Sequence, residues 1–228
     1  MGEARAESTQ EAALPRALLE RLALYHQIAS RLGQEGLDTL ASAQLATMLK
    51  VDATLVRKDM AAAGISGKPK VGYLIGDVLT RLDELLGLGT RNDAILVGCG
   101  RLGSAIAAYT GFAPYGLKIV AVFDNDFSRV GQPVGAHRIL PMEKCRSIIE
   151  IFRVEFAILT VPPDAAQELA NWLVIRGIRA VWNFTPVQLQ LPANVVVRHE
   201  NLDSGLTQLI HSLKRLKTGD AVTVDKSP

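Results

Sequence analysis

The sequence has little that could build a disulfide framework or a metal centre. Its 228 residues include only two cysteines, Cys99 and Cys145, and four histidines. The cysteines lie far apart, and no CxxC pair or Cys/His cluster is present, so neither a disulfide framework nor a bound metal is predicted. Free thiols are typical of a reducing compartment, and we therefore expect a cytoplasmic protein.

Long apolar runs and a strong charge of either sign are also missing. No run approaches the roughly 18 apolar residues of a membrane span, and residues 1–15 are polar and alanine-rich without the apolar segment of a signal peptide. Lysine and arginine total 25 against 23 for aspartate and glutamate, so a surface for nucleic acid would need local clustering. We expect no membrane partner, a disordered start at 1–15 and a disordered tail at 218–228.

The chain does contain enough apolar sequence, 48%, to bury a sizeable core. Residues 16–88 have the pattern of helices with short polar breaks, whereas residues 89–200 alternate apolar runs with helical stretches, as in a parallel α/β sheet. The pattern changes at the glycine-rich segment GLGTRND, residues 87–93. In the second part we expect strands near 93–97, 118–123, 138–140, 155–161, 179–183 and 195–198.

A leucine stripe marks the end of the chain. Leu202, Leu206, Leu209, Leu213 and Leu216 are spaced by 4, 3, 4 and 3 residues, which puts them on one face of a helix. An apolar stripe of this kind has to be covered by another surface.

The stretch ILVGCGRLGSAIAAY, residues 95–109, has the spacing of a dinucleotide-binding loop. The glycines Gly98, Gly100 and Gly103 permit, in turn, a tight turn, a close approach of the main chain to a pyrophosphate, and close packing of helix on strand. Asp124 ends the next predicted strand, where a carboxylate would accept hydrogen bonds from a ribose and repel a 2′-phosphate. This context predicts NAD(H). A coenzyme A site, or a tight turn that has lost its ligand, is the alternative.

Further residues adjoin this loop at the carboxyl edge of the predicted sheet. Arg101 would neutralise the pyrophosphate, and Asn183 would bond a carboxamide. Two strand ends, TVPPDAAQ and WNFTPVQ, would supply apolar ledges, although ordinary strand termination by proline is the competing interpretation. Beyond the glycines and Asp124, the residues assigned to the cofactor are Arg101, Leu102, Asn125, Val161, Pro162, Asn183, Phe184, Thr185 and Pro186.

No catalytic group accompanies this loop. A dehydrogenase needs a proton donor or acceptor beside the substrate carbonyl, usually oriented by a carboxylate. The histidines, His26, His137, His199 and His211, fall in the N-terminal helices, a glycine-bounded loop and the region of the tail. We therefore predict a bound nucleotide without catalysis. An NAD-dependent oxidoreductase with a helical dimerisation domain is the alternative from another class.

Residues 42–60, SAQLATMLKVDATLVRKDM, have the spacing of a helix-turn-helix. Its apolar anchors are Leu45, Ala46, Leu49, Val51 and Val56. Ser42 and Asp52 are placed to cap the two helices, which leaves Thr54, Arg57 and Lys58 on the outer face of the second. We predict that this face enters the major groove of DNA, with Arg57 on a base and Lys58 on a phosphate. A helix pair with a solvated basic face is the alternative.

The stretch that follows, GISGKPKVGYLI, predicts a winged β-hairpin. Lys68 and Lys70 would reach flanking phosphates or the minor groove. Residues 50–70 hold five basic residues against Asp52 and Asp59, so basic charge is clustered locally. Lys50 stands where a glycine usually makes the helix-turn-helix turn, and must adopt that turn's conformation.

These motifs resemble the bacterial redox-sensing repressor family Rex over about residues 18–216. The resemblance rests on LVRKDM and GKPKVGY in the first part, and on VGCGRLGSAI, VAVFDND, LTVPPDAAQ and WNFTPV in the second. It implies a winged helix-turn-helix DNA-binding domain at 16–88, a Rossmann NAD(H)-binding domain at 89–200 and, at 201–217, a dimerisation helix that swaps between the subunits of a homodimer. It further implies that NADH, rising relative to NAD, releases the dimer from palindromic operator DNA.

The chain departs from the family at several positions. Some members couple ligand to DNA through an arginine, an aspartate and a tyrosine. Tyr109 matches the tyrosine, which in those members lies near the nicotinamide, so it is also assigned to the cofactor. Gln27 and Asn201 replace the charged pair, and Leu202 stands where an aromatic often enters the partner's nicotinamide pocket. We predict weaker coupling between NADH and DNA release. The remaining residues assigned to the dimer interface are Leu206, Leu209 and Leu213.

A second departure follows the RKD segment. The family usually has an aromatic pair where this chain has Ala62 and Ala63. Smaller side chains predict thinner packing beside the recognition helix and a changed DNA affinity or target. A Rex paralogue with altered or lost operator binding is therefore a further alternative.

Overall fold

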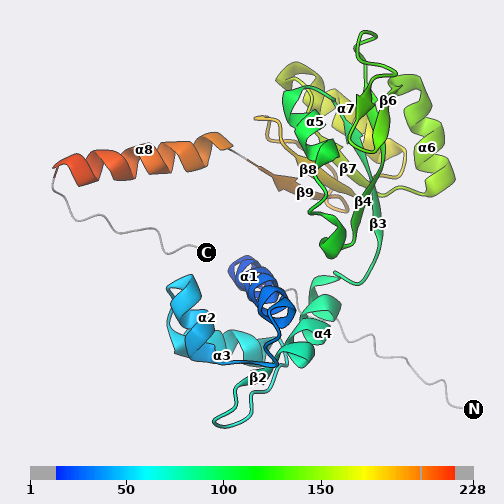
Figure 1. Ribbon diagram of the computed structural model, residues 1–228. Coiled ribbons are helices and arrows are strands. Elements are labelled where there is room, and N and C mark those ends of the chain that lie inside the picture. Colours follow the sequence, from blue (N-terminus) through cyan, green and yellow to red (C-terminus); the bar gives the residue numbers. More distant parts are fainter. Residues whose placement is uncertain (1–13, 201, 219–228) are drawn as a thin grey trace, which may run out of the picture. The chain divides into compact units, whose positions relative to one another are not determined.

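The computed structural model describes residues 14–200 and 202–218. These residues divide into two compact units, with the break between Leu88 and Gly89. Figure 1 shows the helices of the first unit in blue to green and the sheet of the second in green to brown. None of the described helices combines the length and the apolar character that a bilayer crossing requires.

The first unit is mainly helical. Its elements are α1 (Arg16–Gln34), β1 (Thr39–Leu40), α2 (Ser42–Leu49), α3 (Ala53–Ala62), β2 (Tyr73–Leu74) and α4 (Ile75–Leu86). The buried face of α1 carries Leu18, Leu22, Tyr25, Ala29 and Leu32, at the spacing that keeps side chains on one side of a helix. This face packs in one core with Val56 and Met60 of α3 and Val78 of α4.

The wing is a tight loop between α3 and β2. β2 pairs antiparallel with β1, and an isolated antiparallel bridge joins Lys68 to Gly72 inside the loop. Gly72 has φ +94, and a Cβ on it would lie 2.6 Å from the carbonyl oxygen of Leu40, so only glycine fits where the wing passes β1. The predicted hairpin is therefore short, and its second strand pairs with β1.

The second unit is built on a seven-stranded sheet in the order β5-β6-β4-β3-β7-β8-β9. The strands are β3 (Asn92–Val97), β4 (Leu117–Asp124), β5 (Pro133–Val134), β6 (His137–Pro141), β7 (Phe156–Leu159), β8 (Ala180–Asn183) and β9 (Val196–His199). Neighbours are parallel except β5, which is antiparallel to β6. The predicted Rossmann-type sheet is confirmed, with β5 as a strand that the sequence did not predict.

Helices cover both faces of this sheet. α5 (Arg101–Ala108) packs on the face that carries Leu96 and Val122, whereas α6 (Cys145–Phe152) and α7 (Pro163–Ile175) pack on the face that carries Ile95 and Val97. Short 3-10 turns lie at Ala113–Tyr115 (η1) and Met142–Lys144 (η2). The strand order reverses beside β3, which has β4 on one side and β7 on the other. In doubly wound sheets a crevice opens at such a point.

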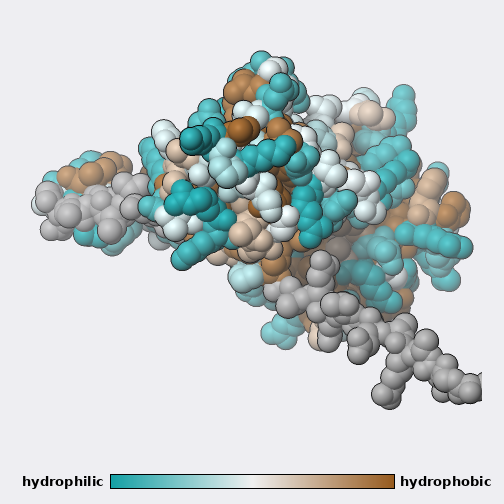
Figure 2. All heavy atoms as spheres, turned by 90° about the horizontal axis from the view of Figure 1, so that it is seen from below, coloured by the Kyte–Doolittle hydropathy of each residue, from teal (hydrophilic) through white to brown (hydrophobic). Residues whose placement is uncertain are grey.

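The last described element is α8 (Leu202–Thr218). Its apolar side chains at Leu206, Leu209, Ile210, Leu213 and Leu216 are between 49% and 67% exposed. Figure 2 shows apolar side chains of this helix, in brown at the left, open to solvent. A single chain therefore leaves the leucine face uncovered.

One predicted helix cap is wrong. Ser42 is the first residue of α2, and Ala41 is its N-cap; the N–H of Ala41 donates to Oε1 of Gln44 at 2.7 Å. A glutamine three residues into the helix thus satisfies the amide that marks its start. The predicted cap of α3 is confirmed, because Asp52 accepts from the N–H of Thr54 at 2.6 Å. Residues 1–13 and 219–228, where disorder is predicted, lie outside the described residues.

Candidate functional site

The glycine loop joins β3 to α5 and is held by the end of β7. Gly98 has φ +94, and a Cβ on it would lie 2.7 Å from the carbonyl oxygen of Thr160; a Cβ on Gly103 would collide with the carbonyl of Gly98. The hydroxyl of Thr160 donates to that same carbonyl at 2.5 Å. The first and third glycines thus serve the turn and the close packing that their spacing predicts.

α5 begins directly after this loop. Gly100 is its N-cap, and no side chain caps the helix. The first-turn N–H groups of a helix lack intrahelical partners and carry partial positive charge, which suits a phosphate. The exposed side chains of Arg101 and Leu102 stand in the same turn. The loop and the first turn of α5 together therefore form a potential binding site for an anionic group.

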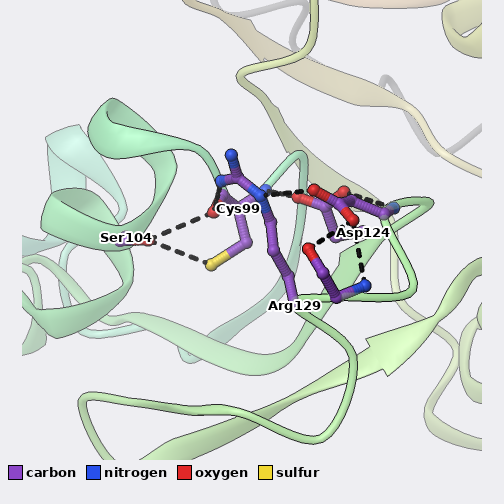
Figure 3. Close-up of polar contacts among 6 residues, drawn as sticks. Cys99, Ser104, Asp124 and Arg129 are labelled. Atoms are coloured by element: carbon purple, nitrogen blue, oxygen red, sulfur yellow. Dashed lines mark hydrogen bonds and ion pairs between the residues drawn. The ribbon is translucent and has the colours of Figure 1, made fainter.

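Asp124, the last residue of β4, ties this loop to the next one. It is only 7% exposed. Its Oδ2 accepts from the N–H of Cys99 at 2.6 Å and its Oδ1 from the N–H of Asp126 at 2.9 Å. Figure 3 shows the carboxylate between the two segments. Besides facing the pocket, Asp124 therefore fixes the shape of the loops, a contribution that sequence reasoning missed.

These loops enclose a pocket of about 850 Å³ at the carboxyl ends of β3, β4 and β7. This is the edge of a doubly wound sheet where ligands bind, and the volume suits a cofactor-sized molecule. The predicted cofactor residues that line it are Gly98, Gly100, Arg101, Leu102, Asp124, Asn125, Val161 and Pro162. Asp126 and Arg129 also line it, and the sequence signal that could have found them is the polar run directly after a predicted strand.

A second candidate site lies on α3 and the wing. Thr54, Arg57 and Lys58 are exposed on α3, and Lys68 and Lys70 are exposed on the wing. A guanidinium nitrogen of Arg57 donates to Oγ1 of Thr54 at 3.0 Å. Hydrogen bonds from Thr54 hold the pKa of Asp52, the N-cap of α3, below its usual value. The first unit thus presents a basic helix and a basic loop to solvent.

A buried ion pair fixes α3 against α1. Both oxygens of Asp59 accept from Arg21, at 2.6 and 2.7 Å, and Oδ2 also accepts from the hydroxyl of Tyr25 at 2.7 Å. Burial, and then the bond to Asp59, raise the pKa of the Tyr25 phenol, which keeps it protonated as a donor. Elsewhere on α1, Nε2 of His26 lies 2.8 Å from Oδ1 of Asp83 in α4. α1 is therefore the element through which α3 and α4 are held.

This arrangement changes the charge that α3 presents. The sequence suggests that Asp59 offsets the basic residues around it. Because Asp59 is turned inward and paired with Arg21, its charge is balanced inside the fold. The outer face of α3 is therefore more basic than its composition indicates.

Two residues that are unusual at their positions, Lys50 in the turn after α2 and Ala63 at the end of α3, are accommodated by the backbone and by α4 respectively. Lys50 has φ 54 and ψ 38, the left-handed conformation that its position predicts. Ala63, where the sequence predicts thin packing, is fully buried, and its carbonyl accepts from Nε of Arg81 in α4 at 3.0 Å. A cation at a helix C-terminus is stabilising. Arg81 thus supports the end of α3 where the aromatic pair is missing.

Comparison with known proteins gives the same two parts. One family model, described as "CoA binding domain", matches residues 90–187, and another, described as "Putative DNA-binding protein N-terminus", matches residues 13–61. The chain is 36% identical over 202 residues to the redox-sensing transcriptional repressor Rex of Carboxydothermus hydrogenoformans, covering 89% of this chain and 97% of that protein. The identity and both coverages are the same for Rex 2 of Thermotoga maritima.

The chain belongs to the Rex family of redox-sensing transcriptional repressors. Solved structures of RSP, a Rex-family repressor, are similar along nearly the whole chain. One, in complex with beta-NAD+ and operator DNA, has a TM-score of 0.83 at 29% identity and covers 92% of this chain and 100% of its own. Another, in complex with beta-NADH, has a TM-score of 0.80 at 27% identity and covers 91% and 98%. The predicted α/β fold with an N-terminal winged helix is confirmed.

Asn183, which its place at a strand end assigns to a carboxamide, is the last residue of β8. This side chain is fully buried; its Nδ2 donates to the carbonyl of Val187 at 2.8 Å and lies 3.0 Å from Nδ1 of His199, while its Oδ1 accepts from the N–H of Thr185 at 3.0 Å. Its polar atoms thus bond within the fold. We interpret Asn183 as a support of its own loop, because an asparagine at a strand end bonds its local backbone as readily as a ligand.

The residues that follow Asn183, namely Phe184, Thr185 and Pro186, lie outside the described pocket lining. Pro186 is exposed and Thr185 is buried. Phe184 joins a row of edge-to-face and tilted rings that runs through Trp182 and Phe112 to Tyr109, with centroid distances of 4.8, 5.5 and 4.8 Å. Tyr109, at the end of α5, is 60% exposed. The row gives this Rex-family chain an aromatic surface that ends in an accessible tyrosine.

The predicted Rex switch positions are only partly within the described residues. Gln27 is exposed on α1. Asn201 lies outside the described residues, as does the side chain of Leu202. Within the part of the chain that the structure covers, no group of three or more His, Cys, Asp or Glu side chains is placed to hold a metal ion.

Proposed function

We propose that this chain is a transcriptional repressor that binds operator DNA as a homodimer, senses the balance of NADH and NAD, and releases the DNA when NADH binds. The observation that carries the proposal is the union, in one Rex-family chain, of an exposed basic recognition helix with a pocket at the switch point of a Rossmann-type sheet. RSP complexes described with operator DNA, beta-NAD+ and beta-NADH support it. No catalytic step is part of the proposal.

Residues 16–88 are assigned to DNA. Arg57, with its planar guanidinium, suits a bidentate contact to guanine, and Thr54 lies beside it on the same face of α3. Lys58, together with Lys68 and Lys70 of the wing, suits phosphates. Ser42, at the start of α2, adds a hydroxyl donor. In a homodimer two such surfaces would read a palindrome.

Residues 89–200 are assigned to NAD(H). The pyrophosphate would lie over Gly100 at the N-terminus of α5, with Arg101 beside it. Asp124 would accept from the ribose hydroxyls, since each carboxylate oxygen retains acceptor capacity after one hydrogen bond. Val161 and Pro162 would bound the pocket on the side of β7. Tyr109 lies outside this lining and would contact the nicotinamide half.

Residues 201–217 are assigned to dimerisation. The leucine face of α8 is uncovered in one chain, and an apolar stripe of this length favours a partner surface. A second copy of the chain supplies such a surface if the helices exchange. Leu206, Leu209 and Leu213 would then be buried in the interface.

The switch would work through differential affinity. A ligand shifts an equilibrium between two dimer geometries only if it binds one of them better. Gln27 and Asn201, where some relatives have a charged pair, would couple the two sites through an uncharged contact. We therefore expect NADH to release the operator less completely than in relatives that have the charged pair.

Operator selection tests the proposal. Random-sequence DNA would be selected with the parent protein at stated salt, and binding to the selected site measured by gel shift with Arg57→Met and, as a control, Arg31→Met. Arg31 is an exposed arginine on α1, paired with Glu35 and not part of the recognition helix. We expect a palindromic site, a loss of affinity of about tenfold or more for Arg57→Met, because one bidentate base contact is removed, and no loss for the control.

Adding NADH completes the test. NADH is expected to release the parent from the selected site. Failure to select any palindrome at low salt would contradict the repressor function, and a selected site that NADH leaves bound would contradict the sensing. Salt has to be held constant, since phosphate contacts make DNA affinity salt-dependent.

A further inference from the structure

The charges around the pocket are unequal. Four carboxylates line it, from Asp124, Asp126, Glu143 and Glu168, against two guanidinium groups, from Arg101 and Arg129. A surplus of negative charge opposes an anionic substituent on the ligand. The two arginines are therefore the groups that decide where the ligand can carry phosphate.

Arg129 joins two of the loops that line the pocket. Its Nη1 donates to the carbonyl of Cys99 in the glycine loop at 2.7 Å, and its Nε donates to Oδ2 of Asp126 at 3.0 Å. Figure 3 shows the side chain reaching from the loop after β4 across to the glycine loop. In dinucleotide-binding folds an arginine in this region accommodates a phosphate on the ribose. Arg129 is engaged instead by Asp126 and the main chain.

Asp126 is built to stay charged. Its Oδ1 accepts from the N–H and the hydroxyl of Ser128, at 2.9 and 2.6 Å, and its side chain is 45% exposed. The bonds from Ser128, and then the guanidinium of Arg129, lower the pKa of Asp126. The carboxylate is therefore ionised at neutral pH and pairs with the guanidinium of Arg129.

Asp124 differs from Asp126 in its surroundings. It is nearly buried and accepts main-chain N–H groups on both oxygens, which balance part of its charge. Asp126 is more exposed to solvent. Its carboxylate pairs with Arg129, whose guanidinium would otherwise be available to bind a phosphate. Asp126 is thus a second carboxylate of the lining beside Asp124, and the one that pairs with an arginine.

We propose that Asp126, by engaging Arg129, makes the pocket selective for adenosine nucleotides whose ribose carries no phosphate. The inference rests on the proposed NAD(H) function and names what the same pocket rejects. NADPH carries its extra phosphate on the 2′-oxygen, and coenzyme A carries one on the 3′-oxygen of the adenosine. Both would meet Asp126 and an arginine already paired. Coenzyme A is a pertinent rival because the family model over residues 90–187 is described by that ligand.

Calorimetric titration of the full chain with NADH, NADPH and coenzyme A tests this selectivity. The proteins are the parent, Asp126→Asn, and the double variant Asp126→Asn with Arg129→Gln. Asparagine keeps an oxygen for Ser128 while removing the charge. The control is Glu150→Gln, which removes one negative charge from an exposed ion pair on α6, outside the pocket lining.

The parent is expected to bind NADH and to bind NADPH and coenzyme A at least about tenfold more weakly, the factor that corresponds to about 1.4 kcal/mol. Asp126→Asn should raise the affinity for each of the two phosphorylated ligands, taken relative to the affinity of the same variant for NADH, by about tenfold. The double variant should lose that gain, because the gain depends on a released Arg129. Glu150→Gln should behave as the parent.

Other results would overturn the inference in distinguishable ways. If the parent binds NADH while Asp126→Asn gains nothing for NADPH or coenzyme A, Asp126 does not set the selectivity. If the double variant keeps the gain, Arg129 is not the phosphate ligand. If the parent binds NADPH or coenzyme A as tightly as NADH, the pocket does not reject ribose phosphates. If the parent binds none of the three, the proposed NAD(H) function is wrong and this inference with it.

Discussion

Lys50 holds a backbone conformation that residues with a Cβ rarely adopt. It ends α2 in the left-handed region, and its side chain is exposed. That conformation costs an L residue roughly 1–2 kcal/mol of folding free energy. Glycine avoids this cost, but part of the gain is offset because glycine loses more backbone entropy on folding. We expect Lys50→Gly to raise the free energy of unfolding by about 0.5–1 kcal/mol, measured by chemical denaturation.

The control for this position is Lys50→Ala. Alanine removes the long side chain but keeps the Cβ, so it should not be stabilising. An equal gain in both variants would assign the effect to the lysine side chain and not to the backbone.

At the scale of single residues, the sequence predicts the residues whose backbone conformation or capping role depends only on their near neighbours in the chain. The turn at Lys50, the cap at Asp52 and the tight turn at Gly98 all follow from position and residue type. Asn183 was not predictable in the same way, because its amide can bond either a ligand or its own loop. Asp59 was misjudged for a related reason: a carboxylate in a basic helix is indistinguishable by sequence from a surface charge until its partner on α1 is known.

Among the elements, α3 depends on α1 for its position. The Arg21–Asp59 pair is largely buried, and losing one partner leaves the other charge uncompensated. We expect Arg21→Met to lower the free energy of unfolding of the first unit by about 3 kcal/mol. Helical circular dichroism in urea follows the helices of both units, so the loss is measured as the part of the helical transition that a probe of the second unit does not report.

The chain carries its own control for this measurement. Its two tryptophans, Trp172 and Trp182, both lie in the second unit. Their fluorescence should keep its urea midpoint in Arg21→Met while the helical signal of the first unit shifts. A helical signal that does not move would show that the pair contributes little to stability.

The elements themselves were well predicted where their hydrophobic pattern is long. The alternation of apolar runs and helical stretches fixed β3, β4, β6, β7, β8 and β9 to within a few residues. β5 has two residues and pairs only with β6, which is too short for a pattern to develop. The wing was predicted as a hairpin from its glycines, but its pairing with β1 depends on a contact distant in sequence.

At the scale of the whole molecule, α8 has an apolar face that a single chain leaves exposed to solvent. Placing a charge on its apolar face should prevent burial against a second copy. We expect the double variant Leu209→Asp with Leu213→Asp to be a monomer by light scattering, under conditions in which the parent is a dimer. Gln208→Asp, on an exposed polar position of the same helix, is the matched control and should remain dimeric. A parent that is monomeric at micromolar concentration would contradict the assignment of α8.

The sequence predicts that this helix needs a partner, but not the geometry of the partner. A leucine stripe specifies burial and leaves the covering surface unspecified, since apolar contact is not directional. The pocket is similar in this respect. Its glycines and Asp124 were predictable from spacing, whereas the crossing of Arg129 to Cys99 depends on how two loops fold over one another.

The bonds that hold the glycine loop also bear on how fast the chain can respond. Asp124 fixes the N–H of Cys99, and Thr160 fixes the carbonyl of Gly98, both from within the chain. A loop shaped in advance loses little conformational entropy when a ligand arrives, and no ordering step has to precede binding. Its occupancy then follows a change in ligand supply without a delay for assembling the site.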